Sequence, residues 1–221
     1  MPANVAVLAS GGGSNLQALL DAAATGAPFV IRRVIVNRPG AFALERAARA
    51  GVPASLIDHT RFAGREAFEA ALQADLEAAG VEWVCLAGFM RVLSAGFVER
   101  WHDRMLNIHP SLLPAFRGLH THRRVLEAGL RITGCTVHVV RPALDEGPVV
   151  VQAAVPVLDD DDEASLAARV LAMEHQAYPM ALGLLTSGAA VIEGERVRLV
   201  QPPADAPKGL IWPKGLIWPG G

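Results

Sequence analysis

Residues 5–20 have the sequence VAVLASGGGSNLQALL. Residues 5–9 are uniformly apolar, as in a parallel strand that is covered on both faces. Three glycines come soon after, and apolar side chains then recur at Leu16, Leu19 and Leu20, which is the spacing of one helix face. A strand, a glycine-rich turn and a helix in this order predict the start of a βαβ unit and hence a parallel sheet.

The same alternation of strand and helix patterns continues along the chain. Further strands are expected at residues 30–36, 54–57, 83–87, 105–108, 133–140 and 149–156, and helices at 42–50, 65–79, 124–128 and 163–185. Right-handed crossovers between parallel strands place helices over the sheet. The pattern therefore predicts an α/β fold with a mostly parallel central sheet and helices on both faces.

Composition excludes several classes of protein. The chain has 221 residues, of which 52% are hydrophobic and 19% charged, so it can bury a core and is not a disordered chain. Its 20 Lys and Arg against 22 Asp and Glu give a net charge of −2, without the basic excess of a protein that grips long nucleic acid. No apolar run approaches the ~20 residues of a membrane span, and no charged leader precedes the first strand. A cytoplasmic protein that binds neither nucleic acid nor membrane is expected.

Residues that often bind metals are present, but their pattern is weak. Cys85 and Cys135 both lie in apolar strand-like runs, which predicts buried free thiols, and two cysteines cannot complete a four-ligand zinc site. His120 and His122 have no cysteine or carboxylate cluster beside them. The acidic residues 159–162 suit the start of a helix. We expect no metal.

The last twenty residues differ in character from the rest. Residues 208–213 have the sequence KGLIWP, and residues 214–219 repeat it. Two copies of six residues are too few for a solenoid. We expect one domain over residues 1–201 and a proline-rich tail at 202–221, which is either a docking peptide or without function.

The glycine turn at residues 10–15 is a candidate anion site. Backbone N–H groups at Gly13, with the side chains of Ser14 and Asn15, can converge on an anion at the positive end of the following helix. Leu16 stands where a dinucleotide fingerprint requires glycine, and no lysine completes a triphosphate loop. The loop therefore favours a single phosphate, with a tight turn and a serine cap as the alternative.

A second candidate site lies in the sequence NIHPSLLP at residues 107–114. In an extended segment Asn107 and His109 project to the same side. An amide can stabilise an oxyanion and an imidazole can move protons, which suits acyl chemistry. Asp145 would orient His109 if the fold brought them together. The alternatives are that Asn107 and His109 only bond to backbone, and that Asp145 is an ordinary turn residue.

Taken together, these segments resemble the glycinamide ribonucleotide formyltransferase family of purine biosynthesis. The resemblance spans roughly residues 4–200, in order. The NIHPSLLP run is specific to folate-dependent formyl transfer, and the SGGGSN loop indicates the member with a phosphorylated ribose substrate. The matching runs are residues 8–17, 86–94, 106–114 and 137–148, followed by Glu174 and His175.

The resemblance implies a formyltransferase-type Rossmann-like fold and a set of site residues. The reaction would move a formyl group from 10-formyltetrahydrofolate, as co-substrate, to the amine of glycinamide ribonucleotide, without a metal, in a monomer or homodimer. Asn107, His109 and Asp145 would be catalytic. The ribonucleotide would be bound by Gly13, Ser14, Asn15 and Glu174, and the folate by Arg65, Met90, Arg91, Val92, Leu93, Asn107, Arg141 and Leu144.

Three other functions fit parts of this pattern. Methionyl-tRNA formyltransferase shares the folate motif but is expected to be longer and more basic. Formyltetrahydrofolate hydrolase is expected to carry a regulatory domain and to lack the Gly-Ser-Asn loop. A binding module without catalysis would not need Asn107, His109 and Asp145 together. Formyl transfer to the ribonucleotide is therefore the leading hypothesis.

Overall fold

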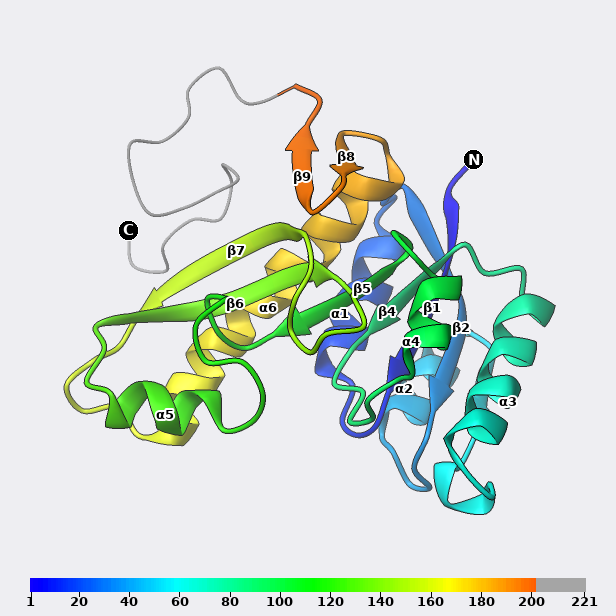
Figure 1. Cartoon of the computed structure of the whole chain (residues 1–221), viewed down its shortest axis with the longest axis horizontal. Coiled ribbons are helices and arrows are strands. Elements are labelled where there is room, and N and C mark those ends of the chain that lie inside the picture. The colour runs from blue at the N-terminus through cyan, green and yellow to red at the C-terminus, as the bar shows by residue number, and fades with distance from the viewer. Residues whose placement is uncertain (202–221) are drawn as a thin grey trace. The chain divides into compact units, whose positions relative to one another are not determined.

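The computed structural model describes residues 1–201 (Figure 1). The predicted tail at 202–221, with its repeated hexapeptide, lies outside the described residues. The chain divides into two compact units. Unit 1 comprises Met1–Asn107 and Val140–Pro142, and unit 2 comprises Ile108–Val139 and the chain from Ala143 on. The expectation of one domain over residues 1–201 stays a prediction.

Unit 1 alternates strands and helices. Its elements are β1 (Ala3–Ala9), α1 (Ser14–Ala24), β2 (Phe29–Val36), α2 (Ala43–Arg49), β3 (Ala54–Leu56), a 3-10 turn (His59–Arg61), α3 (Arg65–Ala78), β4 (Trp83–Leu86), α4 (Ala95–Arg100) and most of β5 (Met105–His109). All of the pairings among its strands are parallel, in the order β3-β2-β1-β4-β5. In the register, Val7 lies between Val34 of β2 and Cys85 of β4.

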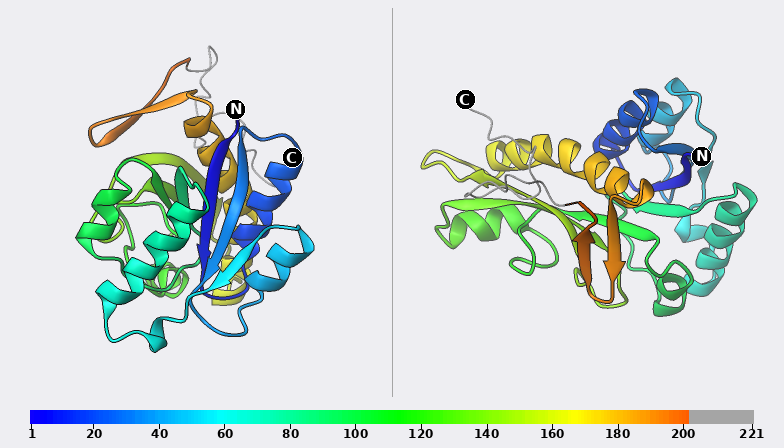
Figure 2. Two further views of the ribbon diagram at one scale, coloured as in Figure 1. Left: turned by 90° about the vertical axis from the view of Figure 1, so that its right-hand side faces the viewer. Right: turned by 90° about the horizontal axis from the view of Figure 1, so that it is seen from above.

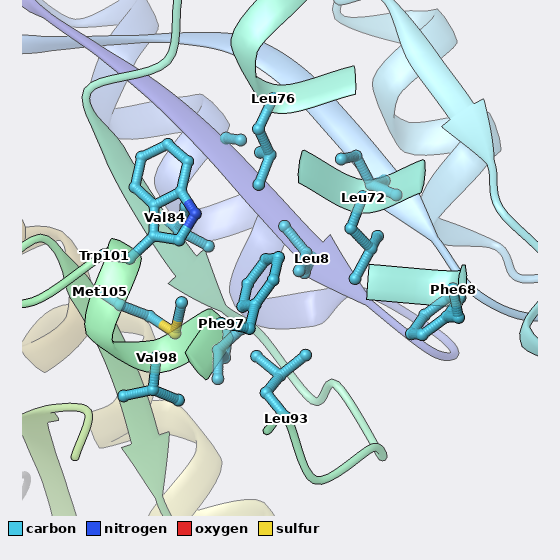
Figure 3. Packing of buried hydrophobic residues seen from close by; sticks show 13 residues of the cluster. Leu8, Phe68, Leu72, Leu76, Val84, Leu93, Phe97, Val98, Trp101 and Met105 are labelled. Atoms are coloured by element: carbon cyan, nitrogen blue, oxygen red, sulfur yellow. The ribbon is translucent and has the colours of Figure 1, made fainter. Parts of the chain in front are cut away.

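Helices cover both faces of the unit 1 strands. Figure 2 shows α1 and α2 on the opposite side of β1 and β2 from α3. Alternation along β1 explains this, because Ala6 and Leu8 face the α3 side while Val5 and Val7 face the other. The apolar cluster on the α3 side is drawn in Figure 3. Its buried members are Ala6, Leu8, Ile35, Phe68, Leu72, Leu76, Val84, Leu86, Leu93, Phe97, Val98, Trp101 and Met105.

Unit 2 is built around one antiparallel pair. It contains α5 (Thr121–Glu127), β6 (Ile132–Val139), β7 (Val149–Pro156), α6 (Glu163–Thr186), β8 (Ala190–Glu193) and β9 (Arg196–Leu199). The long helix α6 packs along β6 and β7 (Figure 1). Close approach of these two strands requires Gly134, because a Cβ there would collide with the carbonyl oxygen of Ala153. β8 and β9 form a separate hairpin.

The predicted α/β fold is confirmed. Strand β5 contributes residues to both units; in unit 2 the strand order continues as β5-β6-β7, and β6 and β7 pair antiparallel. Cys85 and Cys135 are buried and are not in a disulfide, as predicted. No helix within residues 1–201 is long and apolar enough to cross a membrane. Helix α4 and the β8–β9 hairpin were not predicted, because six- and four-residue elements carry too few apolar repeats for a period.

Candidate active site

The glycine loop begins from a fixed serine. Ser10 directly follows β1 and donates its backbone N–H to the carbonyl oxygen of Gly88 at 3.1 Å. Its hydroxyl donates to Asn37 Oδ1 at 2.6 Å and accepts the backbone N–H of Met90 at 2.8 Å. Ser10 and Asn37 are both buried. The start of the loop is therefore tied to two other segments of unit 1.

Gly13 ends the loop in a conformation that favours glycine. Its φ of 69° and ψ of 35° are left-handed, and a Cβ at this position would lie 2.9 Å from Cβ of Ala43. Gly13 is the N-cap of α1, and its carbonyl oxygen accepts the N–H of Gln17 at 2.9 Å. No side chain caps α1, and its first turn has no acidic residue. The alternative of a serine cap is therefore wrong, and the anion-binding role of the loop stays a prediction.

The second candidate site places His109 against Asp145. The distance from His109 Nδ1 to Asp145 Oδ1 is 3.5 Å, and each side chain is only 7% exposed. The other ring nitrogen, Nε2, lies 2.9 Å from the carbonyl oxygen of Phe116. A carbonyl only accepts hydrogen bonds, so Nε2 carries a proton here. Both ring nitrogens thus face oxygen atoms, the Phe116 carbonyl on one side and the Asp145 carboxylate on the other.

Backbone groups and backbone conformation hold Asp145 beside His109. Its Oδ2 accepts the N–H of Gly118 at 2.7 Å. Its own φ of 51° lies in the left-handed region, as do those of Phe116 and His120. Left-handed residues other than glycine are strained and gather at functional sites. The loop after β5 and the turn before β7 are therefore shaped to bring this carboxylate to the imidazole.

A buried polar network fixes the loop between His109 and Phe116. Ser111 donates its hydroxyl to the carbonyl oxygen of Ala115 at 2.6 Å. Thr136 of β6 donates to the carbonyl oxygen of Ser111 at 2.7 Å and accepts the N–H of Leu113 at 3.0 Å. Gln152 of β7 donates to the carbonyl oxygen of Leu113 at 2.9 Å. The Leu113–Pro114 peptide bond is cis. Strands β6 and β7 thus position the loop that carries the Phe116 carbonyl.

Two further histidines in unit 2 have lowered pKa values. Burial lowers the pKa of His138, whose Nδ1 lies 3.1 Å from the carbonyl oxygen of Val139. Burial also lowers the pKa of His122, although the Glu163 carboxylate opposes the shift. Both rings are therefore neutral near pH 7. No group of three His, Cys, Asp or Glu side chains among residues 1–201 could hold a metal ion. The expectation of a metal-free site stays a prediction.

The residues predicted to bind folate lie in differing environments. Met90 and Val92 are 55% and 61% exposed, and Arg91 and Arg65 are also exposed. Leu93 instead is buried in the apolar cluster of unit 1.

Two other predicted ligands belong to the segment before Asp145. The side chain of Arg141 is only 9% exposed, and its Nη2 donates to Asp103 at 2.8 Å. Leu144 is 59% exposed. Folate binding by any of these residues stays a prediction.

Glu174 is buried in the middle of α6. Burial, and then the charge of Glu174, raise the pKa of the Cys135 thiol. The sequence predicts that Glu174 binds the ribonucleotide. That role stays a prediction, as do those of Gly13, Ser14 and Asn15.

The structure brings together one predicted pair from distant parts of the sequence, His109 and Asp145. Asn107 and His109 are two residues apart on β5, so their side chains point to the same side of the strand. Sequence reasoning missed the backbone groups that hold the pair, the Phe116 carbonyl and the Gly118 N–H. Backbone groups leave no residue-type signal, although proline and glycine in this segment mark it as a shaped loop.

Comparison with known proteins decides the family. The sequence profile described as "Formyl transferase" matches residues 3–182. The chain belongs to the formyl transferase family. The chain is 44% identical to the phosphoribosylglycinamide formyltransferase of Escherichia coli (strain K12) over 202 residues, which is 88% of this chain and 95% of that protein.

Two further relatives differ in length. The trifunctional purine biosynthetic protein adenosine-3 of Drosophila melanogaster is 53% identical over 194 residues, which cover 86% of this chain but only 14% of the fly protein. The crystal structure of glycinamide ribonucleotide transformylase 1 from Symbiobacterium toebii has a TM-score of 0.88 and 49% identity, and covers 90% of this chain and 95% of that one. The formyl transferase thus spans a small part of the fly protein and nearly all of the two bacterial proteins.

Proposed function

We propose that this formyl transferase moves the formyl group of 10-formyltetrahydrofolate to the primary amine of glycinamide ribonucleotide. The observation that carries the proposal is the buried contact of His109 with Asp145. His109 lies two residues after Asn107 on β5. A relative that shares 44% identity over 95% of its length is a phosphoribosylglycinamide formyltransferase, which supports the same acceptor. The family identifies formyl transfer, and the glycine loop suits an acceptor with one phosphate.

The reaction requires an oxyanion to be stabilised and one proton to be moved. The acceptor amine attacks the formyl carbon, a C–N bond forms, and the carbonyl oxygen becomes an oxyanion. The bond from the formyl carbon to N10 of the folate then breaks, N10 gains a proton and the amine loses one, so no proton is consumed overall. Asn107 would donate its amide N–H to the oxyanion.

His109 would supply the second charge-stabilising donor. In the structure its Nε2 donates to the Phe116 carbonyl, and its Nδ1 faces Asp145. Donation to the substrate oxygen therefore requires Nε2 to exchange the Phe116 carbonyl for that oxygen. The Asp145 carboxylate favours the imidazolium and accepts the proton that leaves the amine, directly or through water.

Binding of the acceptor would use the glycine loop of unit 1. N–H groups at Gly13, Ser14 and Asn15 would bind the phosphate at the open end of α1. Glu174 would bind the glycinamide end. Holding both substrates together supplies much of the acceleration, since effective molarities reach about 10⁵ M or more. The wider activities of the trifunctional relatives are not part of this proposal.

A substrate-omission assay tests the proposal. Purified protein is incubated with 10-formyltetrahydrofolate and either glycinamide ribonucleotide or buffer, and tetrahydrofolate release is followed. We expect release only with the ribonucleotide, whereas release in buffer alone would support the hydrolase. Asn107→Ala should lower turnover by about 10²–10³, the usual effect of losing one oxyanion donor. Near-normal turnover of a folded Asn107→Ala protein contradicts the assigned role.

A further inference from the structure

Helix α2 holds the glycine loop from one side. Helices α1 and α2 lie side by side in unit 1 (Figure 2). The backbone N–H of Ala43, the first residue of α2, donates to the carbonyl oxygen of Gly11 at 3.1 Å. One turn later, Arg46 donates from Nε to the carbonyl oxygen of Gly12 at 2.8 Å. Two successive carbonyl groups of the loop therefore point toward α2.

The direction of these carbonyl groups fixes the direction of the N–H groups that follow. In a trans peptide the C=O and the next N–H point in opposite directions across the same plane. Because the carbonyl groups of Gly11 and Gly12 face α2, the N–H groups of Gly12 and Gly13 point away from it. A Cβ placed on Gly11 or Gly12 would meet no atom within 4 Å. The loop thus presents two consecutive N–H donors on the side away from α2.

The Arg46 side chain is itself held in place. Its Nη1 donates to Gln17 Oε1 at 3.0 Å, and Gln17 donates in turn to Asp21 Oδ1 at 2.8 Å. The guanidinium also lies over the Phe42 ring, with 5.0 Å from Cζ to the ring centroid. Arg46 is half-buried. These contacts already restrict the rotamers of Arg46. Less side-chain entropy is therefore lost when a ligand binds beside it.

We propose that Arg46 is a positioning residue for phosphate binding, which it promotes by holding the Gly12 carbonyl so that the loop N–H groups face the phosphate. The inference rests on the proposed function and extends it to a residue outside the predicted site. Arg46 also places a positive charge beside the open end of α1, where it reinforces the helix dipole toward an anion. The planar fork of arginine bonds Gly12 and Gln17 from two nitrogens in a fixed geometry, which the single ammonium nitrogen of lysine does not reproduce.

Arg46→Gln is the test, and Arg49→Gln is the matched control. Arg49 lies on the same helix, also stacks on Phe42 at 5.5 Å, and pairs with Glu45, but it is 69% exposed and makes no described bond to the loop. Both variants lose one positive charge. In Arg46→Gln we expect KM for glycinamide ribonucleotide to rise about 10-fold or more, the usual effect of losing a hydrogen bond from a charged donor. kcat, KM for the folate and thermal stability should stay close to those of Arg49→Gln.

A substrate without phosphate separates positioning from a general structural effect. With glycinamide riboside, Arg46→Gln and wild type should have equal kcat/KM, because the group that Arg46 serves is missing. An equal loss with both substrates, or no change in KM for the ribonucleotide, overturns the proposal. Arg46→Lys should give an intermediate KM if Arg46→Gln folds poorly, and an Arg46→Lys protein indistinguishable from wild type would also count against the proposal.

Binding of inorganic phosphate keeps this proposal distinct from the proposed function. Phosphate affinity is measured by titration calorimetry on wild type, Arg46→Gln and Arg49→Gln without other substrates. We expect affinity to fall about 10-fold in Arg46→Gln alone. Failure of wild type to use the ribonucleotide would refute the proposed function, whereas equal phosphate affinity in all three proteins, or none in wild type, refutes the role of Arg46.

Discussion

The loop after β1 and the loop after β5 carry out their roles with different chemical groups. Residues 10–15 offer backbone N–H groups around glycines, and neighbouring residues hold their carbonyl groups. Residues 109–118 instead enclose a buried imidazole, which faces Asp145 and the carbonyl oxygen of Phe116. The first loop is suited to binding a group that does not react, and the second to moving a proton.

The difference follows from what each task requires. A phosphate is recognised by several donors at a fixed separation, and glycines let the backbone supply them without side-chain entropy. Proton transfer needs a titratable side chain, and its geometry is preserved only if the neighbours are rigid. Substitutions in the first loop should therefore affect KM for the acceptor, and those in the second should affect kcat.

The N-termini of α1 and α6 show the same contrast within helices. No side chain caps α1, whereas Asp162 caps α6 and forms a reciprocal capping box with Ser165. Asp161 further binds Arg169 and the N–H of Leu158. The chain thus caps the N-terminus of α6 with its own side chains, whereas α1 begins at a glycine without such a cap.

The largest expected effect is that of His109→Ala. Loss of the imidazole removes a donor to the oxyanion and the partner that holds Asp145 in the site, so kcat should fall about 10³-fold. KM for the ribonucleotide should change little, because the glycine loop is intact. Steady-state kinetics with each substrate varied checks this. His102→Ala, which removes a half-exposed histidine paired with Glu99, is the control and should keep wild-type kcat.

Asp145→Asn should lower kcat by about 10²-fold. The amide keeps the volume and can still accept the N–H of Gly118, but it removes the charge that favours the imidazolium. Because the two side chains act as a unit, the double variant with His109→Ala should be hardly slower than His109→Ala alone. Additive losses in the double variant would mean that Asp145 acts independently of His109 and would weaken the contrast between the two loops.

Gly13→Ala tests the backbone loop and should act on binding and stability instead of kcat. The left-handed φ and the contact with Ala43 strain an alanine, at a cost of about 1–3 kcal/mol in the free energy of unfolding. Displacement of the loop should also raise KM for the ribonucleotide. Urea unfolding and steady-state kinetics measure both effects. Gly12→Ala is the control for stability, since a Cβ there meets no atom within 4 Å. A Gly13→Ala protein as stable as Gly12→Ala contradicts the strain.

Asp161→Asn should affect stability alone, and only above acidic pH. The bidentate bond from Arg169 lowers the pKa of Asp161, whose side chain is 2% exposed. The carboxylate therefore stabilises the fold fully above its unfolded pKa of about 4, and this stability is lost as the pH falls through the lower folded pKa. At pH 7 the variant should be less stable by about 2 kcal/mol.

Urea unfolding at pH 7 and at lower pH measures the effect of Asp161→Asn, and the difference from wild type should shrink below about pH 4. Asp159→Asn is the control, because Asp159 pairs with Arg131 at the exposed surface, where ion pairs contribute little. A constant difference at every pH would exclude the charge of Asp161 as its cause. kcat at pH 7 should be unchanged in both variants.

The sequence predicted the parts of this protein whose geometry is local. Apolar runs predicted β1, β2, β4 and β7 closely, because a strand that is covered by helices on both faces has apolar residues at successive positions. The order of apolar run, glycines and helical repeat predicted the glycine turn between β1 and α1. Placement of Asn107 and His109 on one side of β5 followed from the two-residue period of a strand.

Tertiary structure alone decided which distant groups meet. Asp145 lies 36 residues from His109 along the sequence. Left-handed residues and the buried bond between Thr136 and Ser111 hold the loop after β5 and the turn that carries Asp145. Arg46 reaches Gly12 across 34 residues because α2 packs beside α1. Periodicity in sequence reports which face of an element is buried, whereas contacts between elements depend on loop lengths and packing that no local pattern encodes. The motifs therefore identified the chemistry, and only the fold determined what holds each reactive group in position.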